Sequence, residues 1–428
     1  MTPFPHGKPP GRVQSVFRHA ILPSAASGAV PLGTAPQRPG GPAGPQRQSP
    51  PNGVPSIMRP FAMERWQSTY ENRVAYNLSE SGVHPLTLGE LVELAGDSTA
   101  LESTLLGYGQ SNGSDELRAR IAALYEPVAD VDVVVTNGSA EANYVTLWRL
   151  VEPGSEVAIV VPNYMQGYGL AEAFGARITE IWLREELGWQ PDPDEIERVI
   201  GNRTRLVLVT NPNNPTGAIL SPEARAAIIR AADRVGAWIL ADEVYSGAEL
   251  DGPETPSFLG EYPRTVATGS LSKAYGLPGL RIGWVAAPRA LAADLWARTD
   301  YTTISPGELT DRLATLALDP NVRPRLLQRT RAILHEGLDR LERWARADDA
   351  LVYRPPDAGA ICYIRYRYDI PSLELAERLR VEQDVLVVPG AHFGMDRYIR
   401  IGYGLRGDRL TEALDRVRRT LETLPVRD

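Results

Sequence analysis

Residues 268–284 read TGSLSKAYGLPGLRIGW and hold only two charged side chains, Lys273 and Arg281. A solvated surface loop would carry more scattered charges, and Ser270 and Ser272 place small hydroxyl groups near the lysine instead. A buried ammonium is costly unless a partner accepts it. The stretch therefore predicts that Lys273 has a defined partner or task, which the rest of the chain must identify.

The composition limits the classes of protein to which the chain can belong. The 428 residues are 43% hydrophobic and 23% charged, which is typical of a soluble globular chain. The net charge of −8 argues against a nucleic-acid-binding surface. The single cysteine excludes an internal disulfide, and five histidines without ligand spacing predict no metal site. No apolar run approaches the roughly 18 residues of a membrane helix, so we expect a cytoplasmic protein.

Residues 1–57 differ from the remainder of the chain. They contain 13 of the 36 prolines, eight glycines, five basic residues and no Asp or Glu. Such a segment cannot bury enough apolar surface to fold, and it lacks the apolar core of a secretory signal. We expect a disordered Pro/Gly-rich extension that is dispensable for activity, with a targeting or docking tail as the alternative.

Seven short apolar runs predict strands, and helical stretches separate them. Near-continuous apolar runs suit strands buried on both faces of a mostly parallel sheet. The pattern predicts an α/β fold with a mostly parallel seven-stranded sheet. The runs are VDVVVTNG (131–138), EVAIVVP (156–162), RITEIWL (177–183), RLVLVTNP (205–212), AWILADE (237–243), TVATGS (265–270) and RIGWVAAP (281–288).

Helix signals lie between these runs, and the pattern changes in the last third of the chain. In SDELRARIAALY, Ser114 is placed to cap a helix on which Leu117, Ile121 and Leu124 share one face. A long helical stretch over about 306–347 precedes shorter strand-like and helical runs, which predict a smaller α+β domain. We expect an N-terminal arm at 58–90, a large domain at 91–305 and a small domain at 306–428.

Polar clusters follow several of the predicted strands. They are Gly138 to Glu141, residues 211–217, Asp242, and Ser270 to Lys273. In an open α/β sheet, ligands bind outside the carboxyl ends of the strands. Four polar clusters at one edge therefore predict a ligand site there.

Three motifs carry a resemblance to a known family. NPNNPTG (211–217), ADEVY (241–245) and SLSKAYGLPGLRIGW (270–284) together resemble the class I/II aminotransferases, which are pyridoxal phosphate (PLP) enzymes of fold type I. The likeness runs from about residue 70 to the C-terminus, in the order and spacing of the family. It implies a PLP enzyme that acts on the α-amino acid moiety of a small molecule through an external aldimine and a quinonoid.

The resemblance assigns the cofactor residues. Lys273 would hold the PLP aldehyde as a Schiff base and later shuttle a proton. Asp242 would keep the pyridine nitrogen protonated, which makes the ring an electron sink. The remaining assignments are Asn214 and Tyr245 for the ring hydroxyl oxygen, Tyr164 for stacking on the ring, and Ser270, Ser272, Arg281, Gly138, Ser139 and Ala140 for the phosphate.

The resemblance also implies a dimer and a substrate contact. Tyr108, in a glycine-rich loop, matches the tyrosine that reaches the phosphate of a partner subunit, which implies a homodimer with shared sites. Arg400 matches the arginine that binds the substrate carboxylate with two hydrogen bonds. Gly82 matches the glycine of an element that covers the substrate.

The element around Gly82 departs from the usual pattern, because Val83 and His84 replace its common residues. This variant resembles the natural-product branch that includes capreomycidine synthase and the PLP enzymes of lincosamide biosynthesis. We expect an aminotransferase, with a C–S or β-elimination lyase, a cyclase or a decarboxylating oxidative deaminase as alternatives. A PLP-sensing transcription regulator is a further alternative, but it would need an N-terminal DNA-binding domain.

Overall fold

The structure is a computed structural model, and it describes residues 58–96, 101 and 103–427. The described residues belong to one compact unit. The predicted N-terminal extension, residues 1–57, lies outside the described residues.

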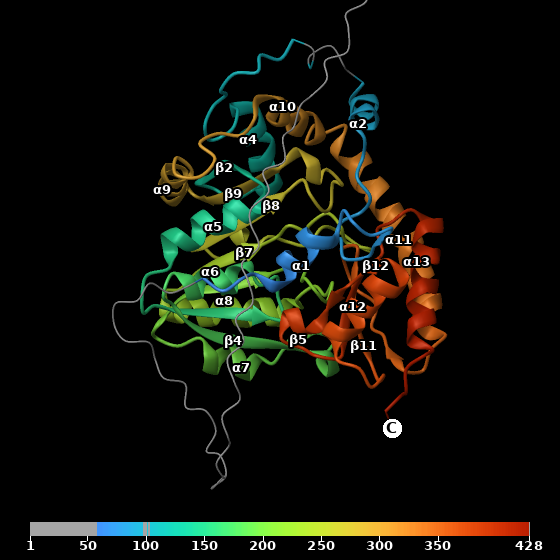
Figure 1. The fold of residues 1–428 in the computed structure, drawn as a ribbon. Coiled ribbons are helices and arrows are strands. Elements are labelled where there is room, and N and C mark those ends of the chain that lie inside the picture. Colours follow the sequence, from blue (N-terminus) through green and yellow to red (C-terminus); the bar gives the residue numbers. More distant parts are fainter. Residues whose placement is uncertain (1–57, 97–100, 102, 428) are drawn as a thin grey trace, which may run out of the picture. The chain divides into compact units, whose positions relative to one another are not determined.

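A large mixed sheet organises the described chain (Figure 1). All seven predicted strands are present in it. The eighth strand, β5, was not predicted, because two residues are too short to show a periodic pattern. In spatial order the strands are β2 (Val131–Asn137), β9 (Ile282–Pro288), β8 (Thr265–Ser270), β7 (Trp238–Asp242), β6 (Thr204–Thr210), β3 (Glu156–Val161), β4 (Arg177–Arg184) and β5 (Gln190–Pro191).

Strands β4, β3, β6, β7 and β8 are parallel, so their carboxyl ends meet at one edge of the sheet. The register pairs Thr210 with Asp242 and Asp242 with Thr268 at that edge. Strand β9 runs antiparallel to β8, with Ser270 opposite Gly283. The segment that carries Lys273 and Arg281 is therefore the short connection between these two neighbouring strands, just beyond the carboxyl end of β8.

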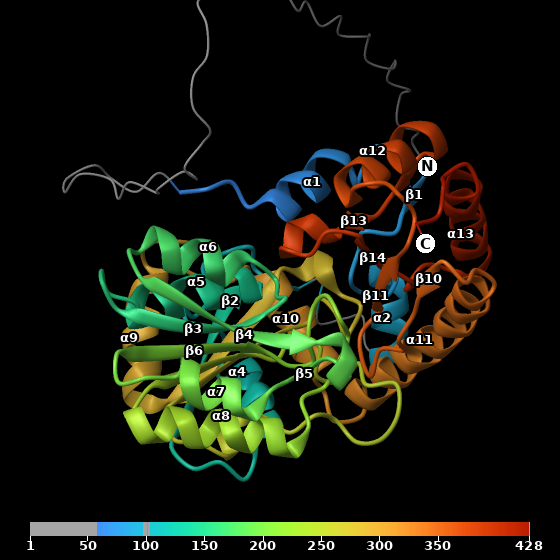
Figure 2. The same cartoon turned by 90° about the horizontal axis from the view of Figure 1, so that it is seen from below.

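Helices cover both faces of the sheet, and the strand alternation explains the arrangement (Figure 2). In β6, Leu206 and Leu208 pack toward one face, while Val207 and Val209 pack toward the other. The first face is covered by α5 (Ser139–Leu150), α6 (Gln166–Ala173) and α9 (Arg289–Thr299), and the second by α7 (Pro193–Val199) and α8 (Pro222–Val235).

The predicted cap of the helix before β2 is confirmed. Helix α4 (Asp115–Ala122) begins after Ser114, whose hydroxyl oxygen accepts a hydrogen bond from the amide of Leu117 at 3.2 Å. Leu117 and Ile121 are buried on the face that the periodicity indicated, whereas Leu124 lies in the short 3₁₀ turn after the helix (Ala123–Tyr125) and is only partly buried.

A smaller antiparallel sheet and three helices form the C-terminal part. The strand order is β10 (Leu351–Val352), β11 (Ile361–Tyr366), β14 (Tyr398–Gly402) and β13 (Val388–Pro389). The helices are α11 (Arg323–Arg346), α12 (Ser372–Gln383) and α13 (Gly407–Leu421). The sequence indicated one long helical stretch over 306–347, but α10 (Glu308–Ala317) ends before α11 begins. Pro320 lies in the break, where it cannot donate a helical hydrogen bond.

The N-terminal segment of the described chain packs along the C-terminal part. Strand β1 (Tyr76–Asn77) pairs in parallel with β12 (Val385–Leu386), and the amide of Gly402 donates to the carbonyl of Leu78 at 2.7 Å. Helix α1 (Ala62–Tyr70) precedes β1, and α2 (Leu88–Ala95) follows it. This pairing carries residues 79–82 to the carboxyl edge of the large sheet, beside Lys273. No helix in the described ranges is long and apolar enough to cross a membrane.

Candidate active site

A cavity of about 260 Å³ lies where the carboxyl edge of the large sheet meets α1, the start of α5 and β14. Ten of the fourteen residues that the sequence assigned to the site line this cavity. They come from six separate stretches of the chain, so only the tertiary fold brings them together. They are Ser139, Ala140, Tyr164, Asn214, Asp242, Tyr245, Ser272, Lys273, Arg281 and Arg400.

The other four predicted residues do not line the cavity. Two of them pack against residues that do: a Cβ on Gly82 would lie 3.4 Å from Cδ of Lys273, and one on Gly138 would collide with the Arg281 guanidinium. Ser270 lines a neighbouring cavity of about 540 Å³. Tyr108 is 91% exposed and lies outside the site within one chain.

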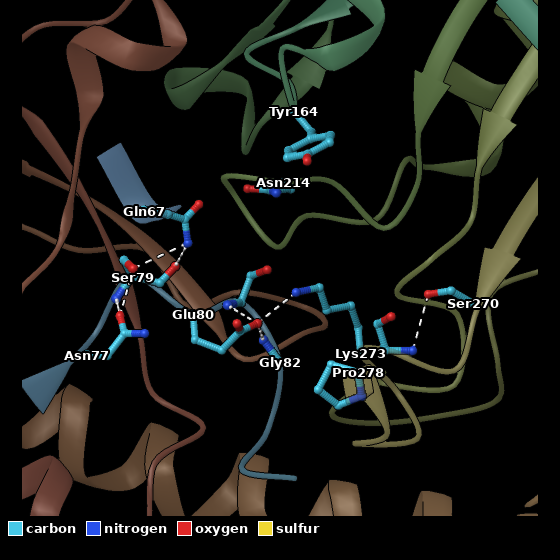
Figure 3. Close-up of polar contacts among 12 residues, drawn as sticks. Gln67, Asn77, Ser79, Glu80, Gly82, Tyr164, Asn214, Ser270, Lys273 and Pro278 are labelled. Carbon is cyan, nitrogen blue, oxygen red and sulfur yellow. Dashed lines mark hydrogen bonds and ion pairs between the residues drawn. The ribbon is translucent and has the colours of Figure 1, made fainter. Parts of the chain in front are cut away.

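Lys273 is held by a carboxylate that the sequence analysis did not assign. Its Nζ donates to Oε1 of Glu80 at 2.7 Å (Figure 3). The same oxygen accepts from the amides of Ser81 and Gly82 at 2.8 and 2.9 Å. Gly402 makes room for this segment, because a Cβ there would collide with the Glu80 carbonyl. Lys273 is one of only two lysines in the chain.

The ion pair shifts the pKa of both partners. The charge of Lys273 lowers the pKa of Glu80 to about 2, although burial acts in the opposite direction. Burial lowers the pKa of Lys273, but the charges of Glu80 and Tyr245 outweigh it and leave that pKa raised. Lys273 is therefore an ammonium near neutral pH in this state of the protein.

Asp242 ends β7 and is buried. Its carboxylate accepts from Nδ2 of Asn143 at 2.9 Å and from the amide of Val244 at 3.2 Å. Oδ1 of Asn143 accepts from the hydroxyl of Thr268 at 2.9 Å, which fixes the orientation of the amide. Burial raises the pKa of Asp242 to about 6. A cationic ring nitrogen beside this carboxylate would remove much of the desolvation cost.

Polar and aromatic groups surround the space between Lys273 and Asp242. Oδ1 of Asn214 accepts from Nη1 of Arg400 at 2.8 Å, which leaves the Asn214 amide nitrogen as a donor. Tyr245 is buried, and burial raises its pKa. Tyr164 lines the cavity beside Asn214 (Figure 3), and its hydroxyl donates to Oε2 of Glu64 at 3.2 Å.

The start of α5 and Arg281 form a pocket for an anion. Gly138 precedes the helix with φ of 77°, so the first amides of a 12-residue helix point into the site. Nη1 of Arg281 donates to the carbonyl of Pro278 at 3.1 Å, and no ion pair of this guanidinium occurs within the described chain. Arg281 itself has a φ of 52°. This left-handed backbone conformation is uncommon for a residue other than glycine, and it occurs here at the turn before β9.

Among the described residues, Arg400 is a buried cation without a carboxylate partner. Arg400 lies on β14 and is only 1% exposed. Its two terminal nitrogens donate to Asn214 and to the carbonyl of Ser79, and its Nε has no hydrogen-bond partner. Burial lowers its pKa. Within the residues that the structure describes it forms no ion pair, so an incoming carboxylate would satisfy it.

The sequence analysis also missed the contribution of α1. Met63, Glu64, Gln67 and, just past the helix, Glu71 all line the cavity. The spacing of 64, 67 and 71 places three polar groups on one helical face, which is a signal that the sequence does contain. Burial raises the pKa of Glu71, and the charges of Glu80 and Glu64 raise it further.

This donor set fits a cofactor with three features: a phosphate, a carbonyl carbon that an amine attacks, and a ring nitrogen that bears a proton. The unpaired Arg281 and the α5 amides suit the phosphate. Lys273 is the amine, and the buried Asp242 suits the protonated nitrogen. PLP has all three features.

Comparison with known proteins agrees with this arrangement. Residues 77–417 match the family described as aminotransferase class I and II. The chain is 34% identical over 383 residues to capreomycidine synthase of Streptomyces vinaceus, which covers 86% of this chain and 95% of that protein.

Solved structures show the same fold. A PLP-dependent aminotransferase from Streptococcus suis superimposes with a TM-score of 0.81 at 32% identity, covering 87% of this chain and all of the other. The PLP-dependent cyclase OrfR gives a TM-score of 0.78 at 27% identity, covering 89% of this chain and 98% of the cyclase. The α/β fold predicted from the sequence, with a large mostly parallel sheet and a smaller C-terminal part, is thereby confirmed.

Proposed function

The chain belongs to the class I and II aminotransferase family, and from this premise we propose that it binds PLP on Lys273 and acts at the α-carbon of an amino acid. One observation carries the proposal. The only lysine in the described chain lines the same small cavity as a buried aspartate, an unpaired arginine at a helix N-terminus and a second buried arginine. Together these four groups match the chemistry of a PLP site.

The residues of this chain have separate tasks in the proposal. When bound, PLP supplies a ring that accepts the electron pair left at the α-carbon after a bond breaks. Asp242 keeps a proton on the ring nitrogen, and Asn143 holds Asp242 in place. Arg281 and the first amides of α5 bind the phosphate, and Arg400 binds the α-carboxylate of the substrate. Lys273 then takes the α-proton and returns a proton to the product.

Amino transfer is the reaction we propose first. Once the substrate has released the amine of Lys273, this amine can remove the proton from the α-carbon. It can then deliver the proton to another atom of the bound substrate and cofactor. Glu80 lies 2.7 Å from the lysine nitrogen and stabilises the protonated form that this transfer produces.

A second candidate is a β-elimination lyase or a cyclase on the same fold. The observation that favours it is the similarity to capreomycidine synthase and to the cyclase OrfR. Amino transfer and β-elimination both begin with loss of the α-proton. A leaving group on the β-carbon of the substrate then determines whether elimination follows. Such an enzyme would act in secondary metabolism, in antibiotic biosynthesis.

We also propose that the active protein is a homodimer. Tyr108 is almost fully exposed in one chain, where it is paired with Gly307 only through a backbone bridge. Leu105 and Leu106 beside it are equally exposed. A contact across a dimer would bury these apolar groups and bring Tyr108 to the phosphate of the partner subunit.

Reduction with borohydride tests the proposal directly. It would fix PLP to its lysine, and peptide mapping would locate the pyridoxyl group. We expect the group on Lys273 and its absence in Lys273→Ala. Mapping is simple because Lys8 is the only other lysine. A pyridoxyl group on Lys8 alone, or on neither lysine, would contradict the proposal.

A further inference from the structure

We propose that Glu64, Glu71 and Glu80 form a subsite that selects amino acids with a positively charged side chain: an ammonium, amidinium or guanidinium group. This inference rests on the proposed function, because it names the substrate class of the same cavity. We call these three residues the acidic wall. All three line the cavity that also contains Lys273 and Arg400.

The charges of the cavity do not balance without such a group. Under the proposed function, Arg281 neutralises the phosphate, Asp242 the ring nitrogen and Arg400 the substrate carboxylate. In the holoenzyme that an incoming substrate meets, the amine of Lys273 is bound to the aldehyde, so Glu80 has lost the one ion-pair partner that it has among the described residues. The acidic wall would then have no positive partner.

The contacts of the individual carboxylates also leave the acidic wall without a cation. Within the described chain, Glu71 forms no ion pair, and Glu64 accepts only the hydroxyl of Tyr164 at 3.2 Å. Burial raises the pKa of Glu71, and the charges of Glu80 and Glu64 raise it further, so Glu71 is repelled by both of the other carboxylates. A protein that bound a neutral or acidic side chain here would retain this repulsion.

A separate observation points to a carboxylate ligand in this cavity. Arg400 is almost fully buried, lines the cavity and has an unpartnered Nε. A carboxylate held by Arg400 places the rest of a small substrate in a cavity of only about 260 Å³. The acidic wall is then the group that the side chain meets.

Glu71 is the residue of the acidic wall that should contribute most to the binding of a cation. Glu64 is exposed at the rim and is well hydrated, so its charge is partly screened. Glu80 already has a role toward Lys273. Glu71 is half-buried and unpaired, and it therefore gains most from a cationic ligand.

Matched pairs of amino acids test the inference on the full-length holoenzyme. L-arginine and L-citrulline have similar size and differ in charge, as do L-lysine and L-norleucine. Binding is followed by the change in cofactor absorbance on titration. We expect the cationic member of at least one pair to bind at least tenfold more tightly than its neutral counterpart.

Two variants assign the preference to the acidic wall. Glu71→Gln should reduce the preference to less than threefold without weakening the neutral ligand, and Glu64→Gln should reduce it less. Glu93→Gln, on the exposed side of α2, is the matched control and should keep the full preference.

The inference is overturned if neither pair shows the preference, or if both variants leave it unchanged. Failure of the proposed function gives a different result, because borohydride would then leave no pyridoxyl group on Lys273. A protein that carries PLP on Lys273 but binds neutral and cationic amino acids equally refutes the acidic wall alone.

Discussion

Lys273 and Glu80 are 193 residues apart in the chain, and their side chains form an ion pair of 2.7 Å at the centre of the candidate site. The segment that carries Glu80 reaches the lysine because β1 pairs with β12 and Leu78 pairs with Gly402. The pair keeps Lys273 protonated, whereas attack on an aldehyde requires the neutral amine. We therefore expect Glu80 to raise the pH at which the lysine becomes reactive.

The first prediction concerns Glu80→Gln. A lysine pKa that is raised by a carboxylate falls when the carboxylate becomes an amide, so neutral amine appears at lower pH. In PLP-depleted protein, the pH midpoint of the rate of PLP loading should therefore move to lower pH. The measurement is the growth of cofactor absorbance after mixing, at a series of pH values. Glu93→Gln should keep the wild-type midpoint, and an unchanged midpoint in Glu80→Gln would show that Glu80 does not control the amine.

The sequence predicted the large sheet well, and the reason is physical. Strands buried on both faces are almost continuously apolar, as in β3 and β6, and few other structures produce such short runs. The capped start of α4 was equally clear, because Ser114 and the spacing of Leu117 and Ile121 agree. The break between α10 and α11 was overlooked, although Pro320 indicates it.

Much of the candidate site was predictable, because many of its residues share a motif or follow a recognisable strand. Lys273 and Arg281 share one loop, and Asp242 ends a recognisable strand. Glu80 was not assigned, because its role depends on a contact between distant segments that no local pattern contains. Whether Tyr108 contributes to a site is a property of a dimer, so a single chain does not test that prediction.

The second prediction is that Asp242 is needed for the reaction at the α-carbon but not for binding of the cofactor. Asp242→Ala should retain PLP on Lys273 but lose α-proton exchange by several powers of ten, because loss of one strong electrostatic contact already costs about 10² to 10³. Asn143→Ala should lose less, since it only orients the carboxylate at 2.9 Å. The measurement is the rate at which the α-hydrogen of a bound amino acid exchanges with deuterated water. Near-normal exchange in Asp242→Ala would refute its role.

The third prediction uses the buried neighbour of Asp242. Glu243 accepts from the hydroxyl of Ser257 at 2.8 Å and from the amide of Phe258 at 3.0 Å, and burial raises its pKa from 4.5 to about 7. Its protonated form therefore favours the folded state, and the contribution to stability is lost as pH rises from 4.5 to 7. Because one pKa unit corresponds to about 1.4 kcal/mol, the loss between pH 5 and 8 should be about 2 to 3 kcal/mol.

Glu243→Gln removes this titration and retains an acceptor for Ser257 and Phe258. Urea unfolding of PLP-depleted protein at pH 5, 6, 7 and 8 should show a smaller decrease in the free energy of unfolding for the variant than for wild type. Glu93→Gln should follow the wild-type curve. Parallel curves for wild type and Glu243→Gln would mean that Glu243 is already ionised in the folded protein at pH 5.

The last prediction concerns Arg400 and the bond that breaks first. A carboxylate bound by the buried Arg400 is stabilised as an anion, and its departure as neutral carbon dioxide would forfeit that contact. Loss of the α-proton to Lys273 keeps the contact, so we expect it to come first. Arg400→Lys should keep PLP but bind the substrate at least tenfold more weakly, because an ammonium cannot donate two parallel hydrogen bonds to a carboxylate.

Two measurements on the holoenzyme, made with an amino acid that it consumes, decide the order of events. Deuterium from the solvent should enter the α-position before any carbon dioxide is released. With Arg400→Lys, the ratio of carbon dioxide release to α-exchange should rise, since the carboxylate is held less firmly, while absorbance shows that PLP remains bound. Accumulation of the pyridoxamine form would then identify amino transfer, and release of a β-substituent without it would identify elimination. Carbon dioxide released by the wild-type enzyme without prior α-exchange would contradict the proposed role of Arg400 and establish a decarboxylating reaction.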